Sequence, residues 1–179
     1  MFNHNYNDMK YYKDTFKNGK HIKNIISLKE YTSRLVKDFP MYNVTWLMNN
    51  FKAQCCYSNA LFLCEADCEG VDYIEGIIVD RQSLGECDKE IMAIHHAWIY
   101  SHKYMCYIEC PPNIIPDKYV YIISDVLSGI NLENFTNSLW LTDQDGEETM
   151  YPRFIHEKDG LYGIIERQWL KDNVKIIDK

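Results

Sequence analysis

The sequence lacks the features that mark several large classes of protein. Its 179 residues contain no apolar run approaching the ~20 residues that a membrane-spanning helix needs. Its eight glycines are isolated, so there is no glycine-rich loop for a phosphate group. None of its seven cysteines forms a Cys-x-x-Cys pair, which argues against thioredoxin-like chemistry and ordinary zinc knuckles. We therefore expect a protein that neither spans a membrane nor carries a cofactor.

An N-terminal secretion signal is missing as well. Residues 1–5 read Met-Phe-Asn-His-Asn and are not followed by an apolar segment. The odd cysteine count suits free thiols in a reducing compartment better than a set of disulfides. Cys64 with Cys68, and Cys106 with Cys110, have a spacing that could serve a metal, but small buried thiols are the commoner outcome. We expect a cytoplasmic protein without a metal site.

Basic residues are scarce over most of the chain. The net charge is −7, yet residues 1–53 carry nine Lys and Arg against four Asp and Glu, whereas residues 54–179 carry ten against 22. This acidic body argues against a surface for duplex DNA, so we expect no nucleic-acid partner. The length fits one domain over residues 25–179, preceded by a basic arm over 1–24. Such an arm is usually solvated, although its charge would suit an anionic partner.

The hydrophobic pattern predicts an α+β fold in which helices precede an antiparallel sheet. Ser27-Leu28-Lys29-Glu30 has the form of a capping box, and Leu28, Tyr31 and Leu35 follow at helical spacing until Pro40. Runs of β-branched and aromatic residues predict four sequential strands. The other expected elements are a short helix or turn over 44–51, a helix over 57–66, strands over 71–79, 92–100, 104–109 and 119–124, a loop over 80–90, a helix over 131–139, an acidic loop over 142–148 and a closing helix over 165–171.

One cysteine lies where a reactive thiol is expected. The segment Gln54-Cys55-Cys56-Tyr57-Ser58-Asn59-Ala60 places Cys56 at the entry to the predicted helix. A helix N-terminus presents N–H groups and the positive end of its dipole, which stabilise a thiolate and can hold the oxyanion of a tetrahedral intermediate. Packing is the more common role of a single cysteine. Cys56 is therefore a candidate nucleophile that still needs a base.

Two histidines on a predicted strand are candidate bases. His95 and His96 are consecutive, so they face opposite sides of the strand and only one of them can face the thiol. If the strands over 92–101 and 104–109 are joined by a two-residue turn, His96 lies directly opposite Glu109, and a carboxylate there can orient the imidazole. A three-residue turn would instead put Glu109 on the other face. A buried core histidine and a solvated carboxylate are the alternatives.

Four short motifs occur in the order of a family signature. They are Cys56-Tyr57-Ser58-Asn59-Ala60, Tyr73-Ile74-Glu75-Gly76, His96-Ala97-Trp98 and Tyr107-Ile108-Glu109. Together they resemble small papain-like Cys-His proteins of bacteria and their phages, which carry Cys-Tyr-x-Asn-Ala, Tyr-Val-Glu-Gly, His-Ala-Trp and Val-Ile-Asp-Pro-Thr. Leu161-Tyr162-Gly163-Ile164 is similar to a further element near their C-termini. The resemblance runs from residue 54 to about residue 170, in short islands.

The resemblance implies a papain-like fold of the NlpC/P60 or transglutaminase kind, with the catalytic cysteine at a helix start packed on an antiparallel sheet. It implies Cys56 as nucleophile, in preference to Cys55, with His96 as base and Glu109 as the third member of a triad. It also implies a protein or peptide substrate, whose amide, peptide or isopeptide bond is hydrolysed or transferred. The alternative is an inactive scaffold that binds or inhibits another protein, for example a phage-encoded inhibitor.

The sequence departs from the family pattern at the acid and at the oxyanion donor. Glu109 stands where the family usually has Asp, and Cys110-Pro111-Pro112 replaces Pro-Thr. Papain-like enzymes use a Gln side chain six residues before the cysteine; Asn50 occupies that position here, and Gln54 is the other candidate. Glu75 matches the family and either supports the site or faces solvent. The sequence leaves the oxyanion donor and the role of Glu75 open.

Overall fold

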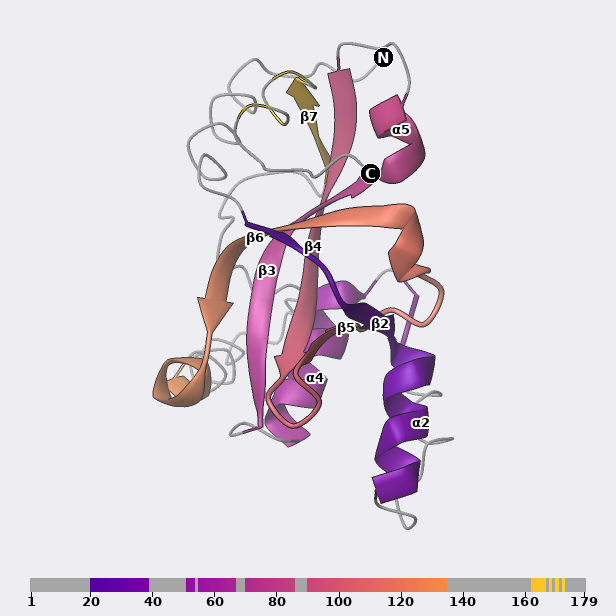
Figure 1. The fold of residues 1–179 in the computed structure, drawn as a ribbon. Helices are drawn as coiled ribbons and strands as arrows, with labels where there is room; N and C mark the ends of the chain where they lie inside the picture. Colours follow the sequence, from indigo (N-terminus) through magenta and orange to yellow (C-terminus); the bar gives the residue numbers. More distant parts are fainter. Residues whose placement is uncertain are drawn as a thin grey trace.

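The computed structural model describes residues 20–38, 51–53, 55–66, 70–85, 90–134, 162–166, 168, 170 and 172. These residues form a mixed α and β fold built on one sheet (Figure 1). No helix among them is long and apolar enough to cross a membrane. The acidic loop expected over 142–148 lies outside the described residues, and so does the helix or turn expected over 44–51 except for Phe51, which is in neither a helix nor a turn.

Seven strands of the described part of the chain form the sheet. Six follow the order β1-β6-β3-β4-β5-β2, and β7 pairs with β4. The pairs are antiparallel except that of β2 with β5, which is parallel and departs from the expected antiparallel sheet. The strands are β1 (Lys20–Ile22), β2 (Ile25–Ser27), β3 (Val71–Asp80), β4 (Glu90–Ser101), β5 (Cys106–Glu109), β6 (Tyr119–Leu127) and β7 (Tyr162–Glu166).

The two shortest strands connect opposite edges of the sheet. β1 pairs with β6 and β2 pairs with β5, although only Lys23 and Asn24 separate them in sequence. Asn24 has a φ of 62°, which Asn tolerates better than most residues, and its carbonyl accepts a hydrogen bond from the N–H of Tyr107 (3.2 Å). This indigo segment crosses the front of β3 and β4 (Figure 1). We call residues 20–27 the strap.

The helix after the strap begins where the sequence predicts. The backbone N–H of Glu30 donates to Oγ of Ser27 (3.2 Å), which caps α2 (Leu28–Asp38). The Glu30 side chain pairs with Arg34 (2.7 Å), so the capping box is formed on the Ser27 side. The buried face of α2 consists of Leu28, Tyr31, Thr32 and Leu35. The predicted helical spacing of the apolar residues is therefore confirmed.

Consecutive residues of β3 and β4 are apolar, and because side chains alternate along a strand, they make both faces of the sheet apolar. On one face, Tyr73 and Ile99 belong to a cluster that includes residues of α2 and of α4 (Cys56–Ala66). On the other face, Trp98 and Tyr121 pack in a cluster with Ile22 of the strap. This second cluster supplies aromatic side chains that contact the candidate site.

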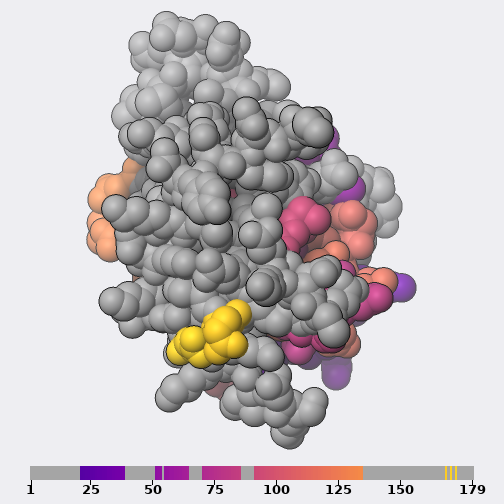
Figure 2. All heavy atoms as spheres, turned by 90° about the horizontal axis from the view of Figure 1, so that it is seen from above, coloured from indigo at the N-terminus to yellow at the C-terminus, as the bar shows by residue number. Residues whose placement is uncertain are grey.

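A third apolar cluster includes a residue close to the C-terminus. Leu170 is fully buried and packs with Ile77, Ile91 and other aliphatic residues of the sheet. Residues near position 170, in yellow, also reach the surface in the view from above (Figure 2). There the side chain of Gln168 donates to Asp172 (2.8 Å).

Several helices and strands were placed correctly by the sequence. The helix predicted over 57–66 is α4, which begins one residue earlier. The strands predicted over 71–79, 92–100 and 119–124 lie within β3, β4 and β6. Residues 129–134 are helical, which overlaps the helix expected over 131–139.

Three other predictions were only partly correct. The expected loop over 80–90 contains a short helix, α5 (Arg81–Gly85), where Asp80 accepts a hydrogen bond from the N–H of Gln82 (2.7 Å). The closing helix expected over 165–171 begins later than predicted: residues 168 and 170 are helical, but residues up to Glu166 belong to β7, which pairs with β4. The strand expected from Tyr104 begins at Cys106, because residues 102–105 form a turn.

Candidate active site

Cys56 is the first residue of α4 and is 7% exposed. The segment before it is held by the buried side chain of Asn59, which donates to the carbonyl of Lys52 (2.8 Å) and accepts from the N–H of Lys52 (3.2 Å). The N–H of Asn59 donates to the carbonyl of Cys55 (2.9 Å) in the first turn of the helix. Asn59 therefore fixes the approach to α4, and this approach sets the position of the thiol.

His96 lies in the middle of β4 and is 3% exposed. Along one edge β4 pairs with β3, where His96 is opposite Gly76. Along the other edge β5 pairs with β4 no further than Ile99, and β7 pairs with it only up to Ile94. His96 therefore lies between the two partner strands of that edge. His95 is also buried and points to the opposite face, as alternation predicts.

Glu109, the last residue of β5, is fully buried and hydrogen-bonded to His96. Nε2 of His96 lies 2.7 Å from Oε1 of Glu109. The predicted contact is therefore present, and Glu109 is not a solvated strand end.

The route to this contact differs from the predicted hairpin. Ser101 pairs with Cys106 instead of Tyr104, so the turn has four residues and the register is displaced by two. Both turn lengths are even, which keeps Glu109 on the face of His96. The last pair of the observed register is Ile99 with Ile108. The next residues along the two strands are Trp98 and Glu109, so Glu109 lies opposite Trp98 and diagonal to His96. The extra methylene of Glu, relative to the Asp usual in the resembling family, suits this diagonal.

The protonation of His96 is set by opposing effects. Burial lowers its pKa, but the charge of Glu109, the charge of Cys56 and hydrogen bonds to both outweigh burial and raise the pKa from 6.5 to about 10. The raised pKa favours the imidazolium form of His96. Since Glu109 takes Nε2, Nδ1 is the ring nitrogen left for the sulfur. A cation beside a thiol stabilises the thiolate, so the three residues form the arrangement that a thiol nucleophile needs.

No family model, curated protein or solved structure matches the chain. Any role for Cys56, His96 and Glu109 rests on their contacts and burial.

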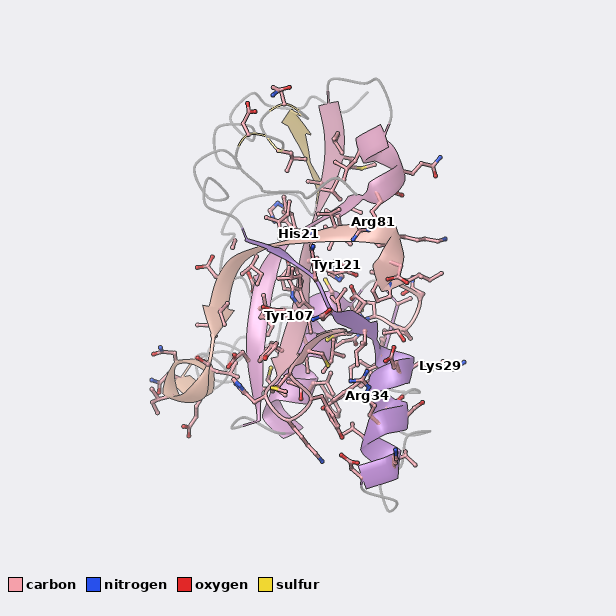
Figure 3. All side chains as sticks on the ribbon, viewed as in Figure 1. His21, Lys29, Arg34, Arg81, Tyr107 and Tyr121 are labelled. Atoms are coloured by element: carbon pink, nitrogen blue, oxygen red, sulfur yellow. The ribbon has the colours of Figure 1, made fainter. Side chains whose placement is uncertain are left out.

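Tyr121 belongs to the site but was not identified from the sequence. Its hydroxyl donates a short hydrogen bond to Oε2 of Glu109. Burial and the Glu109 charge together raise the pKa of Tyr121, so its proton stays on the phenol. Tyr121 lies on β6, near His21, whose Nδ1 is 3.2 Å from the Tyr121 carbonyl (Figure 3). Nothing in its sequence context, an apolar strand, distinguishes it from an ordinary core tyrosine.

Two further residues shape the cluster of aromatic rings that packs around His96. Trp98 is fully buried and stacks on the imidazole with ring centroids 6.0 Å apart. A Cβ on Gly76 would lie 2.7 Å from the Trp98 ring and 2.1 Å from the carbonyl oxygen of Ile122. Glycine at this position therefore allows Trp98 to lie across β3. The motifs that contain Gly76 and Trp98 were the only sequence signal for this packing.

The structure answers one question that the sequence left open. Glu75 is 2% exposed and accepts a hydrogen bond from the hydroxyl of Tyr73 (2.7 Å), so it does not face solvent. Burial, followed by Glu75 and more weakly by Tyr57 and Cys56, raises the pKa of Tyr73 well above its ordinary value. Glu75 is therefore buried beside Tyr73, which is itself near Cys56. The hydrogen bond described for Glu75 is to Tyr73 and not to His96.

The remaining candidates are only partly described. Asn50 and Gln54, the two candidate oxyanion donors, lie outside the described residues. Cys55 is partly exposed, and the described cysteines are free thiols. No group of three or more His, Cys, Asp or Glu side chains in the described part of the chain could hold a metal ion.

Proposed function

We propose that the protein is a cysteine hydrolase or acyl transferase that acts on an amide, peptide or isopeptide bond of a protein or peptide. Cys56 is the nucleophile, His96 the acid and base, and Glu109 the residue that orients His96. The observation that carries this proposal is the placement of one buried imidazole between a thiol and a buried carboxylate. The papain-like motif order, and a helix start beside a sheet, support the same scaffold.

His96 is placed to carry out each proton transfer of such a reaction. The Cys56 thiolate attacks the substrate carbonyl carbon, and the oxyanion forms near the N-terminus of α4, where helix N–H groups and the dipole favour negative charge. The His96 imidazolium gives its proton to the leaving nitrogen, so the amine departs and a thioester remains. Neutral His96 then takes a proton from water or an acceptor amine as this attacks the thioester. The acid or new amide leaves, and the thiolate–imidazolium pair is restored.

The second candidate is a scaffold that binds another protein without turnover. The 7% exposure of Cys56 favours it, because a nucleophile must be reached by its substrate. Both candidates share the fold, and the reactivity of the thiol separates them.

Alkylation of Cys56 by iodoacetamide tests the proposal without a known substrate. At pH 6 we expect Cys56 to react at least about tenfold faster than free cysteine, because a cation beside a thiol increases its reactivity. Mass spectrometry of the peptide that contains Cys55 and Cys56 identifies the labelled residue. The Cys55→Ala variant should keep the fast reaction, and His96→Ala should lose it.

A p-nitrophenyl ester tests the next step. Cys56 should gain the acyl group in the wild type but not in Cys56→Ala, with both proteins folded by circular dichroism. A Cys56 that alkylates no faster than free cysteine, with or without His96, would refute the enzyme proposal and leave the binding scaffold.

A further inference from the structure

The two carboxylate oxygens of Glu109 are shared between two different partners. Oε1 is bonded to Nε2 of His96 (2.7 Å), and Oε2 accepts the hydroxyl proton of Tyr121. Glu109 is fully buried, so it depends on protein donors in place of water. Tyr121 thus completes the hydrogen bonding of a buried carboxylate whose other oxygen faces the imidazole.

The position of Glu109 makes a second partner necessary. It ends β5 and reaches His96 along a diagonal, so its long side chain must hold one rotamer across that distance. Tyr121 comes from β6, which is separated from β5 by β3 and β4 in the sheet. Its ring is itself held, because it packs edge-on against Trp98 with centroids 5.4 Å apart. The fixed phenol of Tyr121 therefore holds the carboxylate of Glu109 at its second oxygen.

We propose that Tyr121 is a positioning residue that holds Glu109 against His96 and thereby maintains the imidazolium beside Cys56. This inference rests on the proposed function, since it assigns Tyr121 to the same chain of groups. Tyr121 does not touch the thiol or the reacting atoms in this scheme. Its effect on the reaction passes through Glu109 and then His96.

Removal of the Tyr121 hydroxyl should weaken the interaction between Glu109 and His96. A buried carboxylate with one donor fewer is a poorer counter-ion and is freer to leave His96. In Tyr121→Phe the pKa of His96 should fall by about one unit, a tenfold change in proton affinity. Alkylation of Cys56 at pH 6 should keep its wild-type rate, because His96 remains protonated at that pH even when its pKa is about one unit lower.

A titration of ¹⁵N-labelled histidine rings by NMR measures the His96 pKa directly. The matched control is Tyr107→Phe, since Tyr107 lies in the same apolar cluster and packs on Tyr100 (centroids 4.9 Å). Tyr107→Phe should leave the His96 pKa and the alkylation rate at wild-type values. Tyr121→Met, which also lacks a donor, replaces Tyr121→Phe if that variant does not fold.

The outcomes separate this inference from the function on which it rests. A wild-type His96 pKa of about 10 with fast alkylation, and the same His96 pKa in Tyr121→Phe, would overturn the role of Tyr121 alone. A wild-type pKa near 6.5 with slow alkylation would remove the proposed function itself. A lower melting temperature in Tyr121→Phe, without a change in the His96 pKa, would show a structural role and count against positioning.

Discussion

Replacing Glu109 by Asp tests whether the length of the carboxylate fits the observed register. The substitution keeps the charge and restores the acid usual in the resembling family. It shortens the side chain by one methylene, which draws the carboxylate back by about 1.5 Å. Because Glu109 lies diagonal to His96, the shorter side chain should no longer reach Nε2.

The expected loss follows from the 2.7 Å contact. At an effective dielectric constant of about 20, unit charges 2.7 Å apart attract by about 6 kcal/mol, and charges about 4.2 Å apart by about 4 kcal/mol. The difference of about 2 kcal/mol corresponds to about 1.5 pKa units. The pKa of His96 should therefore fall from about 10 to about 8.5, and the free energy of unfolding at pH 7 should fall by about 2 kcal/mol.

Histidine NMR titration and urea unfolding measure these two quantities. The control is Glu30→Asp, which shortens an acid that also pairs at 2.7 Å, with Arg34, but at the surface of α2. That change should cost less than about 1 kcal/mol, because water screens an exposed pair. If the His96 pKa stays at about 10 in Glu109→Asp, or if both variants lose equal stability, the diagonal contact does not set the charge of His96.

Two further predictions concern packing and pH. Gly76→Ala should destabilise the protein by about 3 kcal/mol, because the new Cβ would meet a backbone oxygen and the Trp98 ring. The control is Gly85→Ala, whose new Cβ would have nothing within 4 Å and which should change the stability by no more than about 0.5 kcal/mol. Equal melting temperatures of the two variants would contradict the packing argument. Because the pKa of His96 is raised, its charge stabilises the native state fully below pH 6.5, and this stabilisation is lost as the pH rises toward about 10. The difference in the free energy of unfolding between wild type and His96→Gln should therefore become smaller over that range. A constant difference would show that His96 is not charged in the native state.

The sequence predicted the central elements of the fold because their signals are local. The cap at Ser27 and the helical spacing after it define α2, and β-branched runs define β3, β4 and β6. Asp80 before α5 was a similar signal that was overlooked. The position of β7 depends on pairing with the distant β4, which no local pattern encodes.

The candidate site was predictable in its members and less so in its geometry. The turn after Ser101 is longer than expected because Lys103 and Tyr104 both bond to Asp38 at the end of α2, at 2.7 and 2.9 Å. That anchoring is tertiary, so the sequence could not give the register. The contact between His96 and Glu109 was still predicted, because an even displacement preserves the face.

The strap affects how the chain reaches its native state. Ile22 pairs with Tyr121 and Ile26 with Ile108, so the strap is synthesised well before the strands with which it pairs. Such distant pairings raise the contact order, and we expect slow folding that finishes only after β6 has been synthesised. Until then the outer strands carry unsatisfied backbone groups that could pair with another chain. A version that starts after Ser27 would keep those groups exposed permanently and should aggregate.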